Sequence, residues 1–493
     1  MSSLWRNLQY VSWLVSDTSK GLASTLFGFA IPLIALMVTN DPAQAGIIGG
    51  VGAAVRVSLT LFGGVLADRH RRITLMVLGA SVGVVLSVAF TALALGNALT
   101  FASLLVIDVL LAARTGLFDT AGESALKDLV TSDTMGRAQA ANQARDAALQ
   151  LAGGPIGGAL LVVGGWLVGV VMAVCHLISA VTAAAIPRLR GADAVVASEI
   201  SDAAGADAAG ADNAGQDAAS AGLPMSESSP MIGVPAPDVV PGIAASGSIA
   251  AEADADAALA AASAVSAASV TKPNALREIR EGFAWLFSRP DLRGVLLILT
   301  IINLGINTVM TTIVYALQQD GQSPAVIGWI SAGMGVTMLL GALLATPLVS
   351  RIGTGKLMVL GLAALTLGSA ATILTRDPWG IVLVMAVPGL LLAPLNAGMG
   401  GYFMVATPSE LMGRASSASG VFAMGAMPLA PLIAGFGLSL VGRTGTIVIG
   451  VALCVVATAM AIANRPLRSL PAEAGWAEHA RQFEVSRQPV MMP

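Results

Sequence analysis

Charged side chains stand inside long apolar runs of this chain, although Asp, Glu, Lys and Arg make up only 11% of its residues. Ionisable groups are costly in hydrocarbon, so those in membrane-spanning segments are candidates for binding protons, ions or a charged substrate. A carboxylate can take up and release a proton, whereas an arginine stays charged. The candidates for energy coupling or substrate binding are Asp17, Lys20, Arg56, Asp108, Arg114 and Asp119.

Two of these charges can neutralise each other locally. Asp17 and Lys20 are three positions apart and share one face of a helix, so they either form a pair, with the lysine reaching toward the membrane interface, or take part in transport. Arg114 needs a carboxylate partner or an anionic substrate, because its guanidinium keeps its charge. Asp108 and Asp119 lie at unsuitable spacings on the same helix, so we expect the partner on another helix, with Asp17 as one candidate. Proton binding to such a carboxylate could alternate with substrate binding.

Enzymatic and metal chemistry are not indicated by the other reactive residues. His70, His176 and His479 are scattered without metal-ligand spacing. No nucleophile–base constellation and no Gly-x4-Gly-Lys-Ser/Thr stretch occurs. Cys175 and Cys454 lie in apolar runs, where we expect unpaired buried thiols. We therefore predict no catalytic residue, no bound metal and no cofactor.

Long apolar segments must position the charges. With 55% hydrophobic residues and a mean hydropathy of +0.79, the 493-residue chain is too apolar for a water-soluble protein. Segments of about 20 residues cross ~30 Å of hydrocarbon as helices. No cleavable signal peptide is evident, so we expect the first segment to be retained. Twelve spans are predicted, near residues 11–39, 44–66, 73–95, 99–122, 139–163, 166–187, 293–317, 324–349, 356–375, 379–404, 414–440 and 444–463.

The distribution of Lys and Arg predicts the orientation of these spans. If the N-terminus is cytoplasmic, the external loops hold only Arg376 and Arg443, and most other basic residues fall in cytoplasmic segments. We therefore predict a multi-pass protein of the cell membrane (plasma or inner membrane) with both termini in the cytoplasm. The basic character of the spans and their loops suits contact with anionic lipid and gives no reason to expect nucleic acid as a partner.

A polar, low-complexity segment separates the two sets of six spans. Residues 191–270 hold acidic residues but no Lys or Arg, and their Ala/Asp/Gly/Ser text cannot bury enough apolar surface to fold. We interpret it as a disordered cytoplasmic tether, with regulation or partner binding as the less favoured role. Leu276, Ile279, Phe283 and Leu286 then recur at helical spacing, which predicts a short amphipathic interfacial helix. The predicted divisions are an N-terminal bundle (1–187), the linker (188–290), a C-terminal bundle (291–467) and a cytoplasmic tail (468–493).

The two halves carry matching sequence features. The tetrapeptide MGRA occurs at 135–138 and again at 412–415, in equivalent loops. Leu66 and Arg69 have counterparts in Leu348 and Arg351 at a similar offset. These matches favour parallel six-helix repeats, so the predicted fold class is an all-α integral membrane protein with twelve transmembrane helices in two pseudo-symmetric six-helix bundles.

The loop between spans two and three carries a family resemblance. The stretch GGVLADRHRR, with Gly64, Leu66, Asp68, Arg69 and Arg72, resembles the cytoplasmic loop motif of the major facilitator superfamily, although His70 stands where that motif has glycine. The resemblance implies a transporter of two bundles. At a helix end beside arginines, Asp68 could pair with them or with the backbone N–H groups of a neighbouring helix, and so latch the halves together on the cytoplasmic face. The alternative is an ordinary basic cytoplasmic loop.

Further stretches resemble exporters within this superfamily. Gly154, Pro155 and Gly158 in GGPIGG are similar to the Gly-Pro-rich motif of antiporters, where a proline can bend a helix and glycines allow tight packing. Arg114, preceded by Leu110, resembles the arginine motif of span four. Arg56 and the segments joining spans four and five and entering span seven resemble the bacterial enterobactin-exporter and drug-efflux branch.

The resemblance and the buried charges together predict a secondary active transporter. It would export a small organic molecule (drug, siderophore or metabolite) by alternating access, in exchange for protons. The alternatives are a facilitator or importer on the same fold and a membrane scaffold or sensor that transports nothing. The second half is nearly free of buried charge in sequence, which suggests a neutral substrate wall there. Its notable residues, for which interhelical hydrogen bonds are the favoured role, are Asn303, Asn307, Tyr315, Asn396 and Tyr402.

Overall fold

The computed structural model describes residues 4–130, 132–186, 283–408 and 411–484. These residues belong to one compact unit of the chain, which takes in Met1–Arg190 and Ile279–Pro493. The predicted linker, the amphipathic helix up to residue 282 and the last residues of the tail lie outside the described part. Only the end of that amphipathic helix, residues 283–288, is described, and it is helical with Trp285 and Leu286 buried.

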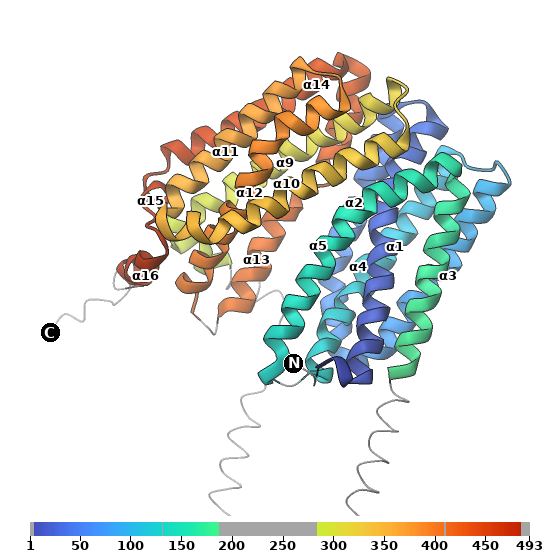
Figure 1. Cartoon of the computed structure of the whole chain (residues 1–493), viewed down its shortest axis with the longest axis horizontal. Coiled ribbons are helices and arrows are strands. Elements are labelled where there is room, and N and C mark those ends of the chain that lie inside the picture. The colour runs from blue at the N-terminus through green and yellow to red at the C-terminus, as the bar shows by residue number, and fades with distance from the viewer. Residues whose placement is uncertain (1–3, 131, 187–282, 409–410, 485–493) are drawn as a thin grey trace, which may run out of the picture. The chain divides into compact units, whose positions relative to one another are not determined.

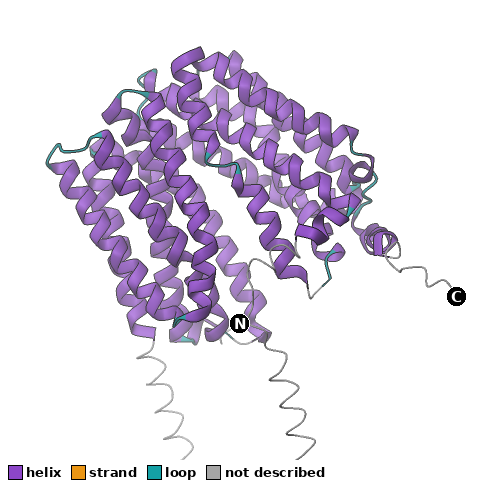
Figure 2. Ribbon diagram, turned by 180° about the vertical axis from the view of Figure 1, so that it is seen from behind, coloured by secondary structure: helices purple, strands orange, loops and turns teal. Residues whose placement is uncertain are grey.

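Six long helices form the N-terminal half (Figures 1 and 2). Their ends agree closely with the predicted spans, apart from extensions by a turn or two at polar ends. They are α1 (Leu8–Thr39), α2 (Pro42–Arg69), α3 (Arg72–Leu95), α4 (Phe101–Leu129), α5 (Ser132–Val163) and a sixth helix, Gly165–Ile186.

The C-terminal half repeats this plan and adds a folded end. Its long helices are α9 (Pro290–Gln319), α10 (Pro324–Arg351), α11 (Thr354–Ala371) with the 3-10 turn η2 (Thr372–Leu374), α12 (Pro378–Ala406), α13 (Met412–Gly425) and α14 (Leu429–Ala463). The short elements α15 (Arg465–Arg468), η4 (Glu473–Gly475) and α16 (Trp476–Glu484) follow.

The described residues contain eleven membrane-length segments but twelve spans, because a glycine divides the last segment into two. The last of the eleven segments, Arg414–Ala463, covers 50 residues and takes in most of α13, the turn at residues 426–428 and all of α14. At 1.5 Å per residue it is roughly 75 Å long, which is more than twice the hydrocarbon thickness. Gly442, at φ 71° and ψ −178°, interrupts the helical backbone of α14. Residues on either side of Gly442 therefore make separate crossings, at the place where the sequence predicts spans eleven and twelve to meet, and the fold has twelve spans.

Three helices begin with the same two-residue device. Asp41, Ser323 and Asp377 each accept a hydrogen bond from a backbone N–H of the first turn, and each precedes a proline at the start of its helix. The side-chain oxygen satisfies a donor that the helix leaves free, and proline lacks the N–H that would otherwise need a partner. These starts lie on the side of the bundle opposite to residues 69–72 and 351–354. We call that side the far side, and the side with residues 69–72 the linker side.

The sequence repeats occupy equivalent places in the two halves. α2 ends at Arg69, where Leu66 O accepts from His70 N at 3.1 Å, and α10 ends at Arg351, where Leu348 O accepts from the next residue at 2.8 Å. The two MGRA stretches lie within the first two turns of α5 and of α13, and the alanine of each is fully buried. The equivalent positions agree with the predicted six-helix repeat.

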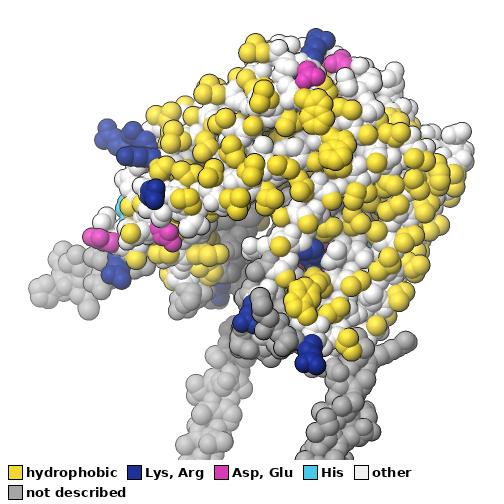
Figure 3. Space-filling model, viewed as in Figure 1, with side chains coloured by type: hydrophobic (Ala, Val, Ile, Leu, Met, Phe, Trp, Pro, Cys, Tyr) yellow, Lys and Arg dark blue, Asp and Glu magenta, His cyan; other side chains and the backbone are white. Residues whose placement is uncertain are grey.

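Besides a smaller contact of α1 with α9, two helix pairs join the halves: α2 packs on α14, and α5 packs on α10. The pairs approach closely because glycines face backbone atoms across the contact, with Gly46 against Pro431 O and Gly158 against Pro324 O. The outward surface of the helices is apolar, and hydrophobic side chains cover most of the face seen in Figure 3, with charged groups gathered toward its edges. Such a surface suits a lipid environment.

Candidate functional site

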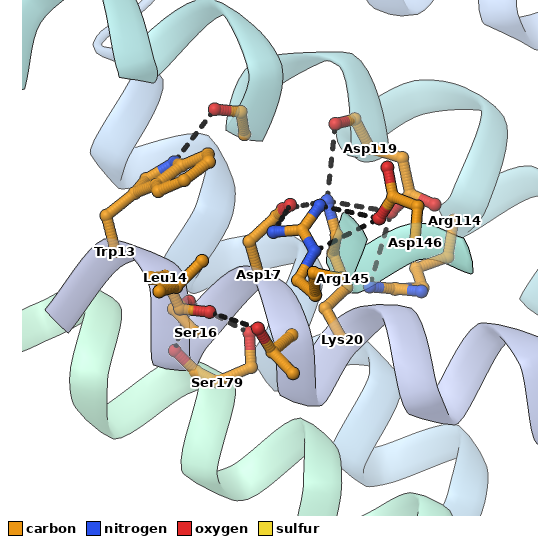
Figure 4. A network of polar contacts seen from close by, with 12 residues as sticks. Trp13, Leu14, Ser16, Asp17, Lys20, Arg114, Asp119, Arg145, Asp146 and Ser179 are labelled. Atoms are coloured by element: carbon orange, nitrogen blue, oxygen red, sulfur yellow. Dashed lines mark hydrogen bonds and ion pairs between the residues drawn. The ribbon is translucent and has the colours of Figure 1, made fainter. Parts of the chain in front are cut away.

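A buried network of charges links α1, α4 and α5 (Figure 4). Asp17, 5% exposed, lies 2.8 Å from Lys20 Nζ through Oδ1 and 2.8 Å from Arg145 Nη1 through Oδ2. Each carboxylate oxygen therefore faces its own cation, which offsets the cost of burying the charge. The predicted Asp17–Lys20 pair is present, but it is part of a larger network.

The contacts of Arg114 differ from the predicted ones. Its Nη2 lies 3.6 Å from Asp119 Oδ1, and its Nε donates to Gly79 O of α3 at 2.9 Å. The expectation that its carboxylate would come from another helix is wrong. Five residues turn a helix by about 500°, which leaves the two Cβ atoms apart, but the long guanidinium side chain closes the gap. Asp119 also lies 3.8 Å from Lys20 Nζ, so it joins Arg114 to the network.

Arg145 belongs to this network and was not among the predicted site residues. Its guanidinium contacts Asp17 and, at 2.8 Å, Asp146, and lies 5.8 Å from the ring centre of Trp13. The only signal in the sequence was an Arg-Asp pair within the run assigned to span five. A charged pair near a helix end usually faces water, so that signal was weak.

A pocket lies between the two halves of the bundle. Its lining includes Gly52 and Arg56 from α2, Asp108 from α4, and Tyr315 from α9. The remaining lining residues are Phe27, Gly28, Ile31, Pro32, Gly49, Ala53, Ala112, Asn307, Thr311, Met427, Ala430 and Pro431.

Three polar atoms at this pocket lack a hydrogen-bond partner among the described residues: Arg56 Nε, Asp108 Oδ2 and the Tyr315 hydroxyl. Asp108 is 5% exposed and Tyr315 is fully buried. Gly52 makes room for the carboxylate, because a Cβ at this position would occupy the space of Asp108 Oδ2. Buried polar atoms without partners are costly and mark a place where a ligand can supply the missing contacts.

The six predicted intramembrane charges therefore fall into two groups. Lys20, Arg114 and Asp119 join Asp17 in the network, whereas Arg56 and Asp108 line the pocket. Asp108 and Arg114 share α4 but are six residues apart, about 240° around the helix, so they face different neighbours.

The loop motif between α2 and α3 is described only in part. Gly64, Leu66 and Arg69 lie in the last turns of α2, and Arg69 is exposed. Arg72 Nη1 donates to Ser124 O at 2.9 Å, which ties the start of α3 to α4. The side chain of Asp68 lies outside the described part, so its role as a latch stays a prediction.

The glycines of the predicted antiporter motif mediate contact between the halves. Gly154 packs against Gly328 O and Ser331, and Gly158 against Pro324 O of α10. Pro155 lies between them within a continuous α5. These positions fit a role in close packing of α5 on α10.

The C-terminal half holds a buried charge cluster at its linker side, although its spans had been expected to be nearly free of charge. Arg289 Nε and Nη2 donate to the two carboxylate oxygens of Asp291 at 3.0 and 2.8 Å, and the Tyr402 hydroxyl donates to Asp291 Oδ2 at 2.6 Å. Arg289 is 3% exposed and Asp291 is fully buried. Burial lowers the pKa of Arg289, but the hydrogen bonds and charge of Asp291 outweigh it and leave that pKa raised.

The other polar residues of the second half behave in two ways. Asn303 donates to Ala423 O of α13 and, like Tyr402, makes a predicted interhelical hydrogen bond. Asn307, which lines the pocket between the halves, donates to Asn303 O of its own helix. Tyr315 instead lines the pocket between the halves, and Asn396 lines an apolar pocket within the C-terminal half. Cys175 and Cys454 are buried free thiols, and no metal-binding group of three or more His, Cys, Asp or Glu occurs in the described ranges.

The family model for the Major Facilitator Superfamily matches residues 18–271 and 295–491. The chain belongs to the Major Facilitator Superfamily. The match comes in two parts, one for each half of the fold described above, and a transporter fold of this superfamily implies a small-molecule substrate. A comparison with curated proteins found no significant match.

Solved transporters share the fold of this superfamily member at low sequence identity. A POT family transporter in complex with 5-aminolevulinic acid has a TM-score of 0.62 at 9% identity, over 93% of this chain and 96% of that one. A bacterial homologue of the iron transporter ferroportin in an inward-facing state has a TM-score of 0.59 at 13% identity, over 94% and 99%. A D-xylose–proton symporter has a TM-score of 0.57 at 13% identity, over 96% and 99%. Likeness at this identity concerns the fold alone.

Proposed function

We propose that this superfamily member is a secondary active transporter that exports a small organic molecule, such as a drug, a siderophore or a metabolite, in exchange for protons. The observation that carries the proposal is the pocket between the halves. Arg56 and Asp108 line it from the N-terminal half, and Tyr315 from the C-terminal half. A change in the angle between the halves would therefore open the site to one side of the membrane at a time.

Contacts between the halves near the far side support this mechanism. Gln318 Nε2 of α9 donates to Leu33 O of α1 at 2.8 Å, and Gly158 of α5 packs on the start of α10. Interfaces of this kind, with small residues at close approach, can separate when the halves rock. We propose that they part when the pocket opens to the far side.

The charge network offers a way to couple protons to this motion. Asp17 is shared by Lys20 and Arg145, while Asp119 is shared by Lys20 and Arg114. A proton on either carboxylate would leave a buried cation short of a partner, and the cations would have to redistribute. Because the network joins α1, α4 and α5, such a redistribution would alter the packing of helices that also line the pocket or contact the other half.

The basic residues at the linker side support an orientation in the membrane. We propose that this side is cytoplasmic, that both termini lie there, and that the protein resides in the cell membrane. The Gly64–Arg72 motif would then serve as the cytoplasmic gate, with Asp68 as its latch. The division into bundles 1–187 and 291–467, joined by the linker 188–290 and followed by the tail 468–493, belongs to the same proposal.

Export is favoured over import by the antiporter-like motif of α5 and by the resemblance to the enterobactin-exporter and drug-efflux branch. The test is uptake of candidate compounds into everted membrane vesicles with an acidic interior. We expect uptake that depends on the chain and that stops when a protonophore collapses the gradient. Unchanged uptake without the gradient would contradict proton exchange and favour a facilitator.

A sensor or scaffold role is separated from transport by the linker. A chain that lacks residues 195–268 should keep its transport activity, because the pocket and the network lie in the bundles. If transport were absent from the full chain while this deletion abolished a signalling output, the sensor alternative would replace the proposal.

A further inference from the structure

The pocket between the halves holds two opposite charges that do not pair with each other. Arg56 of α2 and Asp108 of α4 both line it, and their charges interact across space. Arg56 Nε and Asp108 Oδ2 both lack a hydrogen-bond partner within the described chain. By contrast, the opposite charges of the neighbouring network meet at 2.8 Å. The two pocket charges are thus held apart and available to a third group.

The balance of charge limits which ligand can satisfy both groups. Arg56 and Asp108 are the only Lys, Arg, Asp or Glu among the described lining residues, so the pocket is neutral when both are charged. A purely cationic ligand would pair with Asp108 and leave Arg56 facing a second positive charge. A purely anionic ligand would do the reverse. Uncompensated buried charges are strongly unfavourable.

We propose that the pocket binds a small zwitterion, an amino-carboxylate whose ammonium faces Asp108 and whose carboxylate faces Arg56. The inference rests on the proposed function, because it takes this pocket as the transport site. The ligand's carboxylate can accept a charge-assisted hydrogen bond from the Arg56 guanidinium, and its ammonium can donate one to the Asp108 carboxylate.

The rest of the lining defines the body of this ligand. The Tyr315 hydroxyl lines the same pocket as Asp108 and has no hydrogen-bond partner among the described residues, so it can hydrogen-bond to a ligand bound there. Phe27, Ile31 and Met427 give the pocket apolar walls, and apolar walls with a few convergent polar groups are typical of small-molecule sites. The ligand is therefore an amino-carboxylate with an apolar side chain.

Binding to the purified full chain tests the charge requirement. The probes are alanine, leucine and phenylalanine, each compared with its methyl ester, which is a cation, and with its N-acetyl form, which is an anion. We expect at least one of the amino acids to bind at least tenfold more tightly than both of its derivatives. A derivative that binds as tightly as the best amino acid would overturn the assignment.

Two variants then test which residue reads which charge. Arg56→Gln should lower affinity for the amino acid at least tenfold and leave the methyl ester bound as well or better. Asp108→Asn should show the same loss for the amino acid, with the N-acetyl form spared. The charge-matched controls Arg376→Gln and Asp320→Asn, both exposed on far-side loops, should bind like the wild type. Equal losses for all three ligand forms in either pocket variant would contradict the pairing.

The outcomes separate this inference from the proposed function. If no amino acid binds but another compound is exported, and Arg56→Gln or Asp108→Asn abolishes that export, the pocket is the transport site and the zwitterion assignment is wrong. If both variants export that compound like the wild type, the pocket is not the transport site, and the proposed function loses its main support.

Discussion

Asp17 Oδ2 on α1 lies 2.8 Å from Arg145 Nη1 on α5, which makes a buried ion pair between two helices of the N-terminal half. The same aspartate also pairs with Lys20, and Trp13 lies beneath the Arg145 guanidinium. This arrangement fixes the position of α1 relative to the helix that contacts the other half. It is the basis of the first prediction.

Arg145→Met should destabilise the protein because it leaves Asp17 with a single cation. The expected loss is about 1–3 kcal/mol, less than the ~3–5 kcal/mol for a buried charge left with no partner, since Lys20 remains. Unfolding of the purified protein by a denaturing detergent measures it. Arg376→Gln, which removes a charge from an exposed loop, should change the stability by less than about 0.5 kcal/mol. Equal stability of the two variants would show that the pair contributes nothing.

Proton coupling should depend on the carboxylates and cations of the network. Asp17→Asn and Arg114→Ala are expected to reduce proton-driven export at least tenfold, because neither variant can redistribute charge when a proton arrives. Substrate exchange without a gradient should fall less, since neither residue lines the pocket. Wild-type export in both variants would remove the network from the coupling mechanism.

Close packing of α5 on α10 should require a glycine at position 158. A side chain there would meet the Pro324 carbonyl and Ala325 Cα, which are backbone atoms of the other half. Gly158→Val should therefore cost about 1–3 kcal/mol in stability and reduce transport. Gly420→Val is the matched control, because a Cβ at Gly420 meets no atom within 4 Å. Similar effects in both variants would point to helix propensity rather than to the contact between the halves.

The folded C-terminal end should loosen in acid. Trp476 Nε1 donates to Thr354 Oγ1 at 2.9 Å, and the His479 ring lies 5.9 Å from that of Tyr402, which places α16 against α11 and α12. Burial lowers the pKa of His479, opposed by the charge of Asp291. The undocked tail therefore binds protons more readily, so docking is fully favourable above the ordinary histidine pKa of about 6.5 and weakens as the pH falls below it.

Hydrogen exchange of residues 465–484 measures this effect. Exchange should speed up between pH 7.5 and pH 5.5, after correction for the intrinsic pH dependence, and His479→Gln should abolish the change. Persistence of the acceleration in His479→Gln would assign it to another group.

Most of the helical framework could be predicted because hydrocarbon imposes a simple rule on length and composition. The predicted ends of α1, α3 and α10 fall within a few residues of the observed ones. The junction near Gly442 was also predictable, since Arg443 interrupts an apolar run too long for one crossing. The break of the preceding span between α13 and α14, at residues 426–428, was not predicted, because no charge or helix-length limit marks it.

The pairing of the charges could not be predicted. Sequence spacing placed Asp17 and Lys20 on one face, but the choice of Asp119 by Arg114 depends on the reach of a flexible side chain. The contact of Arg145 with Asp17 depends on how α1 and α5 pack, which periodicity does not specify. Asp291 was missed because an acidic residue two positions after an arginine at a helix start normally faces water, whereas here Tyr402 and Trp285 pack against the Arg289–Asp291 pair.

The central claim is that the two halves rock around the pocket, and paired distances measured with spin labels test it most directly. One pair, His70 and Ser416, reports on the linker side, and the other, Val163 and Gln322, reports on the far side. Adding a transported compound at acidic pH should shorten the linker-side distance and lengthen the far-side distance in the same population of molecules. If substrate crosses the membrane while both distances stay fixed or change in the same direction, the account is contradicted.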